Sequence, residues 1–307
     1  MTSNAISVRG LRKSYGDHVA LDDVDFDVPA GSVFALLGPN GSGKSTTVNV
    51  LSTLIGADAG RVEVGGHDVS RSPMEVRAAI GVSGQQVALD PWLTGRENLR
   101  LMVDLHHLRR REGIERVNRV LVDFSLEGAA DRPVMTYSGG MQRRLDLAMT
   151  LLGQPRILFL DEPTTGLDPR SRRQLWGDIR RLVATGVTVF MTTQYLEEAD
   201  ALADRIALLD KGRLVADGTP AELKALVPGG HVHIAFDDSA SLDNAARALA
   251  SAWCTIDEEN LSLQIPGDAT VGSLRALNTV QLPEDARVTL VQPDLDDVFL
   301  TLTEAAR

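Results

Sequence analysis

The stretch VFALLGPNGSGKSTTVNVLSTLI, residues 33–55, joins an apolar strand pattern to a helical pattern through a glycine-rich loop. Residues 38–46 match the phosphate-binding pattern G-x-x-x-x-G-K-[ST]. Glycines let backbone N–H groups wrap a polyphosphate, and a helix N-terminus adds positive potential. Lys44 is then expected to hold the β and γ charges, and Ser45 to ligate Mg²⁺. A chance glycine turn is the alternative, which the flanking strand and helix disfavour. The loop predicts a nucleoside triphosphate site of the kind that kinases and GTPases share.

A second motif, ILFLDEP at residues 157–163, ends a short apolar run in two carboxylates. The run places Asp161 at the carboxyl end of a buried strand, where it can complete the Mg²⁺ shell. Glu162 stands beside it as a base for the attacking water. An adjacent carboxylate pair is more often a solvated turn, but the apolar run and the phosphate loop upstream favour the catalytic interpretation.

Two further stretches place small or polar residues where an anion could bind. In YSGGMQRRLDLAMTLL, residues 137–152, the sequence Ser138–Gly139–Gly140 opens an amphipathic helix. In TVFMTTQYLEEADALADRIALL, residues 188–209, Gln194 stands where a buried strand opens onto a loop, the edge at which open α/β sheets bind ligands. A plain helix cap is the alternative at both positions.

Taken in order, these motifs resemble those of the nucleotide-binding subunits of ABC transporters, over about residues 4–225. Several motifs in one order and spacing are far more specific than any one of them. The resemblance implies that two such domains sandwich two ATP molecules, each held by one subunit's Walker A loop and the other's signature helix. The matching positions are the aromatic loop at Tyr15, Walker A at 38–46, the Q-loop at Gln85, the signature at 137–142, Walker B at 157–162, the D-loop at 166–168 and the switch position at 194.

The resemblance also implies a role for each matched residue. Tyr15 would stack on adenine, Gln85 would reach Mg²⁺ and the attacking water, and Asp168 would act across the dimer. Gln86 is a rival for Gln85, and a surface or core aromatic is the alternative for Tyr15. The implied nucleotide-binding residues are Tyr15, Gly38, Asn40, Gly41, Ser42, Gly43, Lys44, Ser45, Thr46, Gln85, Ser138, Gly139 and Gly140; the catalytic residues are Glu162, Gln194 and Asp168; and the metal ligands are Ser45, Gln85 and Asp161.

The sequence departs from the family pattern at three positions. Tyr137 and Met141 stand in the signature where the commonest form has Leu and Gln, and the phosphate-facing serine and glycines remain. Gln194 stands where most of the family has histidine. A carboxamide can donate a hydrogen bond to a phosphate oxygen, but it cannot exchange a proton near neutral pH as imidazole can. If hydrolysis persists, the general base is therefore elsewhere, and Glu162 is the obvious candidate.

Three segments are similar to one subgroup, the daunorubicin and doxorubicin resistance type of drug-export ATPases. They are VSGQQVALD at the Q-loop, TTQYLEEADALADRIALLD at the switch and PDLDDVFLTLTEAA near the end. This similarity implies a separate integral membrane permease, a second ATPase subunit in a homodimer, and a place at the cytoplasmic face of the membrane. The alternatives are a soluble ABC ATPase that acts on ribosomes or DNA, and an ATP-gated module with weak hydrolysis.

The order of patterns along the chain predicts an α/β fold, a P-loop NTPase with a mixed β core. Residues 1–29 predict an antiparallel β subdomain, and residues 93–152 a helical subdomain. Pro and two glycines in KALVPGGHVHIAF place a boundary between domains 1–228 and 229–307. In the second domain the predicted order of elements is βαββαβα, which indicates a small ferredoxin-like α+β domain. Its expected elements are strands 231–236, 253–256, 261–265 and 287–291 and helices 240–251, 271–279 and 294–305.

Composition narrows the function classes. The 307 residues carry a net charge of −11, which argues against coating nucleic acid. From His231 onward there are 13 acidic and four basic residues, a net −9, so the second domain is either a regulatory or dimer-stabilising domain or a solvated acidic one. The single cysteine, Cys254, excludes an intramolecular disulfide. We find no long apolar run and no signal peptide, so the chain is expected in the cytosol.

Overall fold

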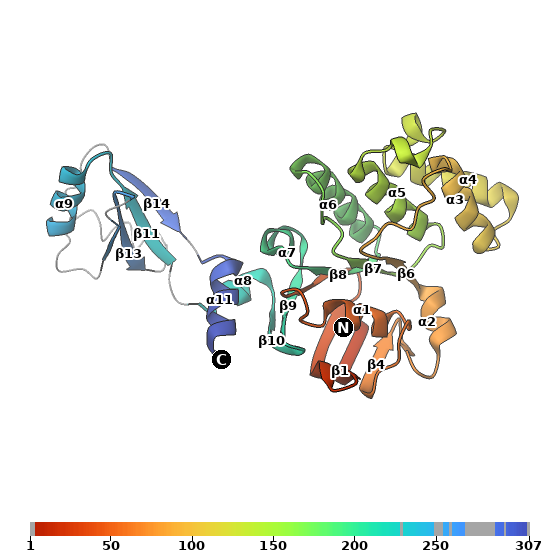
Figure 1. Cartoon of the computed structure of the whole chain (residues 1–307), viewed down its shortest axis with the longest axis horizontal. Coiled ribbons are helices and arrows are strands. Elements are labelled where there is room, and N and C mark those ends of the chain that lie inside the picture. Colours follow the sequence, from red (N-terminus) through yellow and green to blue (C-terminus); the bar gives the residue numbers. More distant parts are fainter. Residues whose placement is uncertain are drawn as a thin grey trace. The chain divides into compact units, whose positions relative to one another are not determined.

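The computed structural model describes residues 4–227, 230–248, 254–257, 260–267, 286–291 and 293–305. The chain divides into two compact units, Met1–Pro220 and Ala221–Arg307 (Figure 1). The sequence places this boundary after residue 228, where Pro and Gly cluster, whereas the structural division falls after residue 220. Most of the short helix α8 (Pro220–Lys224) therefore belongs to the second unit. Within the described ranges, no helix has the length and apolar content needed to cross a bilayer.

A six-stranded sheet in the order β10-β9-β3-β8-β7-β6 forms the centre of the first unit. All neighbours from β9 to β6 pair in parallel, and β10 pairs antiparallel at the edge. Both faces of the three central strands are covered, which is why they are continuous runs of apolar and β-branched residues. The mixed core expected from the sequence is confirmed. Its strands are β3 (Val33–Leu37), β6 (Ile80–Ser83), β7 (Ile157–Asp161), β8 (Thr188–Thr193), β9 (Arg205–Asp210) and β10 (Arg213–Gly218).

A second, antiparallel sheet in the order β2-β1-β4-β5 covers one side of this core. The rings of Phe26 on β2 and Phe34 on β3 stack with centroids 5.2 Å apart, and those of Phe34 and Phe190 on β8 stack at 5.5 Å. This aromatic column fixes the two sheets against each other. The strands are β1 (Asn4–Tyr15), β2 (His18–Pro29), β4 (Ala59–Val64) and β5 (His67–Asp68).

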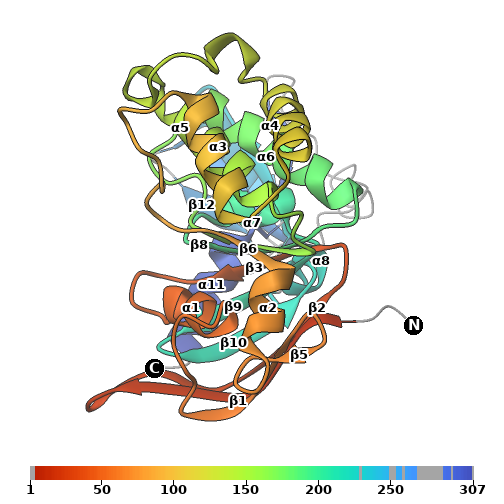
Figure 2. The same ribbon diagram turned by 90° about the vertical axis from the view of Figure 1, so that its right-hand side faces the viewer.

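Helices α3, α4 and α5 form the helical subdomain, on the side of the parallel sheet away from β1 and β2 (Figures 1 and 2). Thr94 and Glu97 form a capping box that starts α3. The subdomain is built from α3 (Gly95–Leu105), α4 (Arg110–Asp123), the two 3₁₀ turns Glu127–Ala129 and Val134–Thr136, and α5 (Gly139–Leu151). The other helices of the first unit are α1 (Lys44–Leu51), α2 (Pro73–Ala79), α6 (Pro169–Ala184) and α7 (Leu196–Leu202).

The second unit holds a four-stranded antiparallel sheet in the order β12-β13-β11-β14. This is the order of a ferredoxin-like split βαβ unit, as expected from the sequence. Val232, Ile234, Leu242 and Leu263 pack its core. The expected helix 271–279 lies outside the described residues. The elements are β11 (Gly230–Ala235), α9 (Ser239–Ala248), β12 (Thr255–Asp257), β13 (Ser262–Gly267), β14 (Arg287–Val291) and α11 (Leu295–Ala305).

Candidate nucleotide-binding site

The phosphate loop lies between the carboxyl end of β3 and the start of α1. Gly43 precedes α1 with φ +109°, a conformation that favours glycine. A Cβ at Gly43 would lie 2.6 Å from the carbonyl oxygen of Ala20, and one at Gly38 would collide with the carbonyl of Leu209. The two glycines of the motif are therefore required by the close approach of neighbouring backbone as well as by the turn.

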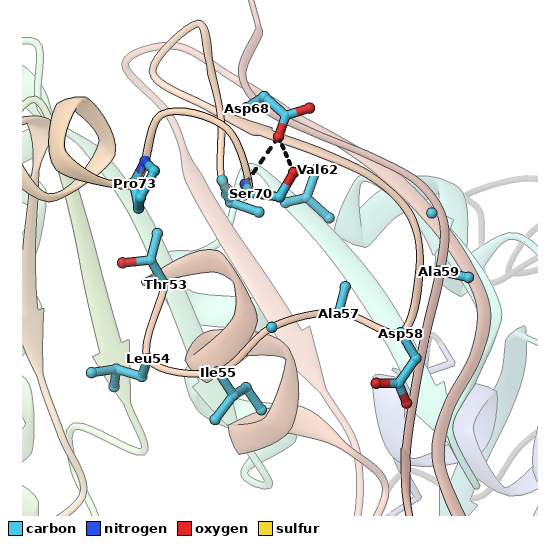
Figure 3. Close-up of a pocket in the computed structure, with 13 residues that line it drawn as sticks. Thr53, Leu54, Ile55, Ala57, Asp58, Ala59, Val62, Asp68, Ser70 and Pro73 are labelled. Carbon is cyan, nitrogen blue, oxygen red and sulfur yellow. Dashed lines mark hydrogen bonds between the residues drawn. The ribbon is translucent and has the colours of Figure 1, made fainter.

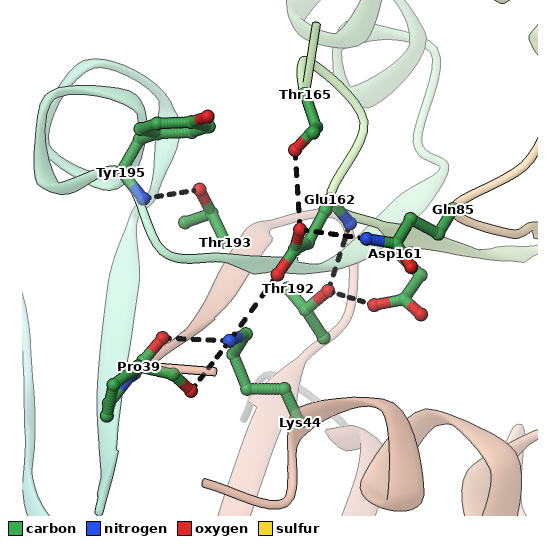
Figure 4. Close-up of polar contacts among 10 residues, drawn as sticks. Pro39, Lys44, Gln85, Asp161, Glu162, Thr165, Thr192, Thr193 and Tyr195 are labelled. Atoms are coloured by element: carbon green, nitrogen blue, oxygen red, sulfur yellow. Dashed lines mark hydrogen bonds and ion pairs between the residues drawn. The ribbon is translucent and has the colours of Figure 1, made fainter. Parts of the chain in front are cut away.

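Lys44 brings a buried positive charge to this loop. Its side chain is 5% exposed, and Nζ donates to the carbonyl oxygens of Gly38 at 2.8 Å and Pro39 at 3.0 Å. Nζ also lies 3.5 Å from Oε1 of Glu162 (Figure 4). These partners compensate the cost of burying an ammonium group, and they hold it beside the phosphate loop.

Glu162 is held by neighbours from several segments. Its φ of +47° lies in the left-handed region, and its amide donates to the carbonyl and the hydroxyl of Thr192 at 3.1 Å and 3.0 Å. Its Oε2 accepts from Nε2 of Gln85 and from Oγ1 of Thr165, each at 3.3 Å (Figure 4). A non-glycine residue in this conformation is uncommon and is kept in place by its surroundings. The carboxylate is thus aimed, 8% exposed, at Lys44 and Gln85.

A cavity of about 280 Å³ lies against the phosphate loop. The predicted residues that line it are Tyr15, Asn40, Gly41, Gly43, Lys44, Ser45, Thr46, Gln85 and Glu162, so the cavity joins the aromatic loop, Walker A, the Q-loop and Walker B. The choice of Gln85 over Gln86 agrees with this lining. His18 and Ala20 also line it, and we did not predict them. Both residues lie at the start of β2, directly after the hairpin that carries Tyr15. Their closeness to Tyr15 in the sequence could have predicted that they line the same cavity.

The remaining predicted residues do not line this cavity. Ser138 caps α5, its Oγ accepting from the amide of Met141 at 3.3 Å, and both Ser138 and Gly139 are exposed. Asp168 caps α6 by accepting from the amides of Arg170 and Ser171 at 2.9 Å and 3.0 Å. The hydroxyl of Ser171 also donates to Asp168, and this is the largest cause of a pKa below the usual value for that carboxyl.

Gly140 brings the signature helix against the start of α6. A Cβ at this position would collide with the side chain of Ser171, the same residue that binds Asp168. The signature and the D-loop therefore lie side by side within one chain. Tyr137 is accommodated nearby: it is buried, its hydroxyl donates to the carbonyl of Ala129 at 2.7 Å, and a side chain at Gly95 would collide with that hydroxyl.

Gln194 lies between β8 and α7 and is half-buried. The N-cap of α7 is Tyr195, and no side chain caps that helix. Within the described part of the chain, no hydrogen bond of the Gln194 side chain is found. The helix-cap interpretation of Gln194 is therefore wrong, which leaves the ligand-facing one as a prediction.

The groups expected to ligate Mg²⁺ are of the chemical type that this ion prefers. A hydroxyl at Ser45, an amide oxygen at Gln85 and a carboxylate at Asp161 are hard oxygen ligands. Since Nε2 of Gln85 donates to Glu162, its amide oxygen remains for a cation. Asp161 already accepts from the hydroxyl of Thr192. The described residues contain no cluster of three or more His, Cys, Asp or Glu side chains suited to a metal, so a cation here depends on the hydroxyl and amide ligands.

A second cavity, of about 450 Å³, holds none of the predicted site residues (Figure 3). It lies where the chain leaves α1 and enters β4, and Leu54, Ile55 and Val62 contribute apolar walls. Of its two carboxylates, Asp58 accepts from Nζ of Lys13 at 2.7 Å, and Asp68 accepts from the amide and the hydroxyl of Ser70 at 2.9 Å and 2.6 Å. Asp68 thereby closes a local turn, and both carboxylates of this cavity have partners within the described part of the chain.

The parallel sheet, the glycine cradle and the lysine and glutamate beside it define a P-loop ATPase. A model of the family "ABC transporter" matches residues 21–165. Daunorubicin resistance ATP-binding protein DrrA3 of Streptomyces coeruleorubidus is 48% identical over 99% of this chain and 97% of its own length. Daunorubicin/doxorubicin resistance ATP-binding protein DrrA of Streptomyces peucetius is 45% identical, covering 98% and 93%. The chain belongs to the family of ABC transporter ATP-binding proteins.

Among solved structures, the chain is similar to the ATP-binding cassette MJ0796, described as dimeric in a post-hydrolysis state bound to ADP and Pi. The TM-score is 0.63 at 27% identity, over 70% of this chain and 98% of that one. The shared part is about the size of the first unit.

Proposed function

We propose that this chain binds and hydrolyses ATP as the subunit that powers efflux of a drug or other lipophilic compound through a separate membrane permease. The main observation behind this proposal is the cavity at the phosphate loop, where the side chains of Lys44, Gln85 and Glu162 converge. The two relatives named for daunorubicin or doxorubicin resistance match the chain nearly end to end and support the export role.

For hydrolysis, we assign the proton transfer to Glu162. Gln85 and Thr165 orient its carboxylate, which takes the proton of the attacking water. Lys44 carries the positive charge expected to bind the β- and γ-phosphates. Mg²⁺, held by Ser45, Gln85 and Asp161, would neutralise charge on the phosphates when bound. Tyr15 is half exposed at the cavity rim, in a position to stack on adenine.

We propose that the working form is a homodimer with two nucleotides between the subunits. The exposure of Ser138 and Gly139, outside the cavity that Lys44 lines, supports a role for them at the partner's nucleotide. Asp168, exposed at the start of α6, would act across the same interface. The dimeric state named for the similar MJ0796 cassette is a further support. ATP then closes the dimer, and hydrolysis reopens it.

We place the chain at the cytoplasmic face of the membrane, bound through the permease. The net charge of −11 disfavours a nucleic-acid partner. The test is to purify the tagged chain from solubilised membranes of its native host and to identify what co-purifies. A stoichiometric integral membrane protein is expected. Recovery with ribosomes or DNA, and with no membrane protein, would contradict the export role.

Replacing Gln194 with alanine is expected to lower the turnover number about tenfold, because one hydrogen bond to a charged oxygen is lost. The loss should be smaller than that for Glu162→Gln, because the amide introduced at position 162 cannot take the proton of the attacking water. The measurement is steady-state ATPase activity at saturating ATP. The matched variant is Gln194→His, which restores the common family residue and should keep activity within a few-fold. A loss in Gln194→Ala as large as that in Glu162→Gln would contradict the assignment of the base.

A further inference from the structure

Arg143, on the second turn of α5, is a buried cation outside the cavity. Its side chain is 5% exposed. Its three guanidinium nitrogens donate to three carbonyl oxygens: Nε to Pro163 at 2.8 Å, Nη1 to Gly84 at 2.7 Å and Nη2 to Asp161 at 3.1 Å. Gly84 precedes the Q-loop glutamine, and Asp161 and Pro163 flank Glu162. One side chain of the signature helix thus binds the backbone on both sides of Glu162 and directly before Gln85.

Asp146, one turn further along α5, binds both ends of the same loop. Its Oδ1 accepts from the amide of Ala88 at 2.9 Å, and its Oδ2 accepts from the hydroxyl of Ser83. It is 4% exposed and lies 3.7 Å from Nη1 of Arg143. Residues 83–88 are therefore fastened to α5 before and after Gln85. We call Arg143 and Asp146 the Q-loop clamp.

The clamp has the chemistry of a positioning device. A guanidinium presents donors in a fixed planar fork, so its three nitrogens can each hold a separate carbonyl, whereas the three donors of a lysine share one nitrogen. Burial is the largest influence on the pKa of Arg143 and lowers it, while Asp146 and Asp161 act in the opposite direction. Breaking such a buried pair leaves an uncompensated charge, so the arrangement tolerates little displacement.

The position of Gln85 is what the clamp controls. Between the two fastened ends, Nε2 of Gln85 donates to Oε2 of Glu162 at 3.3 Å, and no other described contact of the Gln85 side chain is found. We propose that Arg143 and Asp146 are positioning residues that place Gln85 at the catalytic carboxylate and couple its position to the signature helix. This rests on the roles proposed above for Gln85 and Glu162. Because Ser138 caps α5, a shift of that helix on contact with a partner's nucleotide is passed directly to Gln85.

A double-mutant cycle on the full-length chain separates positioning from simple stabilisation. Arg143→Met is expected to lower the turnover number at least tenfold, about 1.4 kcal/mol. In a Gln85→Ala background the same change should cost clearly less, because one of the two residues that it positions is already absent; the remaining loss reports the bonds of Arg143 beside Glu162. The affinity for ATP, set mainly by the phosphate loop, should stay within about threefold. Equal losses in both backgrounds would overturn the proposal.

The matched control is Arg144→Met on the same helix. Arg144 donates to the carbonyl of Phe124 at 2.9 Å, within the helical subdomain, and has no described contact with residues 83–88. Any loss it causes should be the same with and without Gln85. Arg143→Lys, which keeps the charge but not the fork, guards against misfolding of the methionine variant and should recover only part of the turnover.

Hydrogen exchange of residues 84–88 tests the clamp without reference to catalysis. Asp146→Ala and Arg143→Met are each expected to speed exchange of the Ala88 amide at least tenfold, while exchange in β3 stays unchanged. Unchanged exchange in both variants would overturn the clamp itself. Faster exchange together with normal turnover in Gln85→Ala would instead show that the proposed role of Gln85 is wrong and that the clamp has no catalytic consequence.

Discussion

Replacing Glu162 with glutamine is expected to reduce ATP turnover by 10²-fold or more while ATP binding persists, because general-base catalysis contributes about that much. Glutamine has nearly the same shape, so contacts with Gln85 and Thr165 can be kept. It cannot accept the proton of the attacking water. The negative charge 3.5 Å from Lys44 is also removed, which leaves more of the lysine's charge for phosphate.

The measurement is phosphate release at saturating ATP, together with equilibrium binding of ATP and scattering to follow dimerisation. The variant should accumulate an ATP-bound dimer, because closure continues and reopening does not. Glu63→Gln, on β4 and paired with Arg61, is the matched control and should keep wild-type turnover. Turnover near the wild-type rate in Glu162→Gln would overturn the base assignment, and an ATP-bound variant that stays monomeric would overturn the dimer.

Replacing Lys44 with alanine is expected to weaken ATP binding by about 10²-fold and to abolish turnover. The lost interaction is a buried, charge-assisted one with the β- and γ-phosphates, which is among the strongest that a side chain can make. The change also leaves Glu162 without its neighbouring cation, so the carboxylate repels the incoming phosphates. Both effects act in the same direction.

Binding is best measured by titration with ATP at fixed ionic strength, since phosphate contacts are screened by salt. Lys13→Ala is the control: Lys13 pairs with Asp58 and lies over the ring of Tyr15, so its loss should change affinity by no more than a few-fold. Binding of ATP by Lys44→Ala within threefold of the wild-type affinity would contradict the placement of the triphosphate in this loop.

The phosphate loop and the Walker B carboxylates were predictable because their signals are local. An apolar run of five residues predicts a buried strand, and whatever follows it stands at the ligand-binding edge of the sheet. Lys44, Gln85 and Glu162, separated by many residues along the chain, meet in the structure because each follows or begins an element at that edge. The ferredoxin-like order of the second unit was predictable from alternating patterns for the same reason.

Other features had no local signal. The serine cap at Ser138 and the anion-binding interpretation share one sequence pattern, and the structure shows the cap, while the role at a partner's nucleotide stays a prediction. Gln194 precedes a helix and has a polar side chain, which suits a cap, yet the chain turns so that Tyr195 takes that place. The domain boundary expected after residue 228 stays a prediction, because Pro and Gly mark where a chain can bend and not where packing ends.

By itself, the sequence determined the P-loop fold, the ABC family and most of the residues that line the cavity at the phosphate loop, because these follow from residue type and spacing within single strand–loop–helix units. Only the tertiary structure decided that Tyr137 occupies space left by Gly95 and that α5 fastens the Q-loop. The physical reason is that each of these contacts joins segments far apart in the chain, through backbone carbonyls and amides that carry no mark in the sequence.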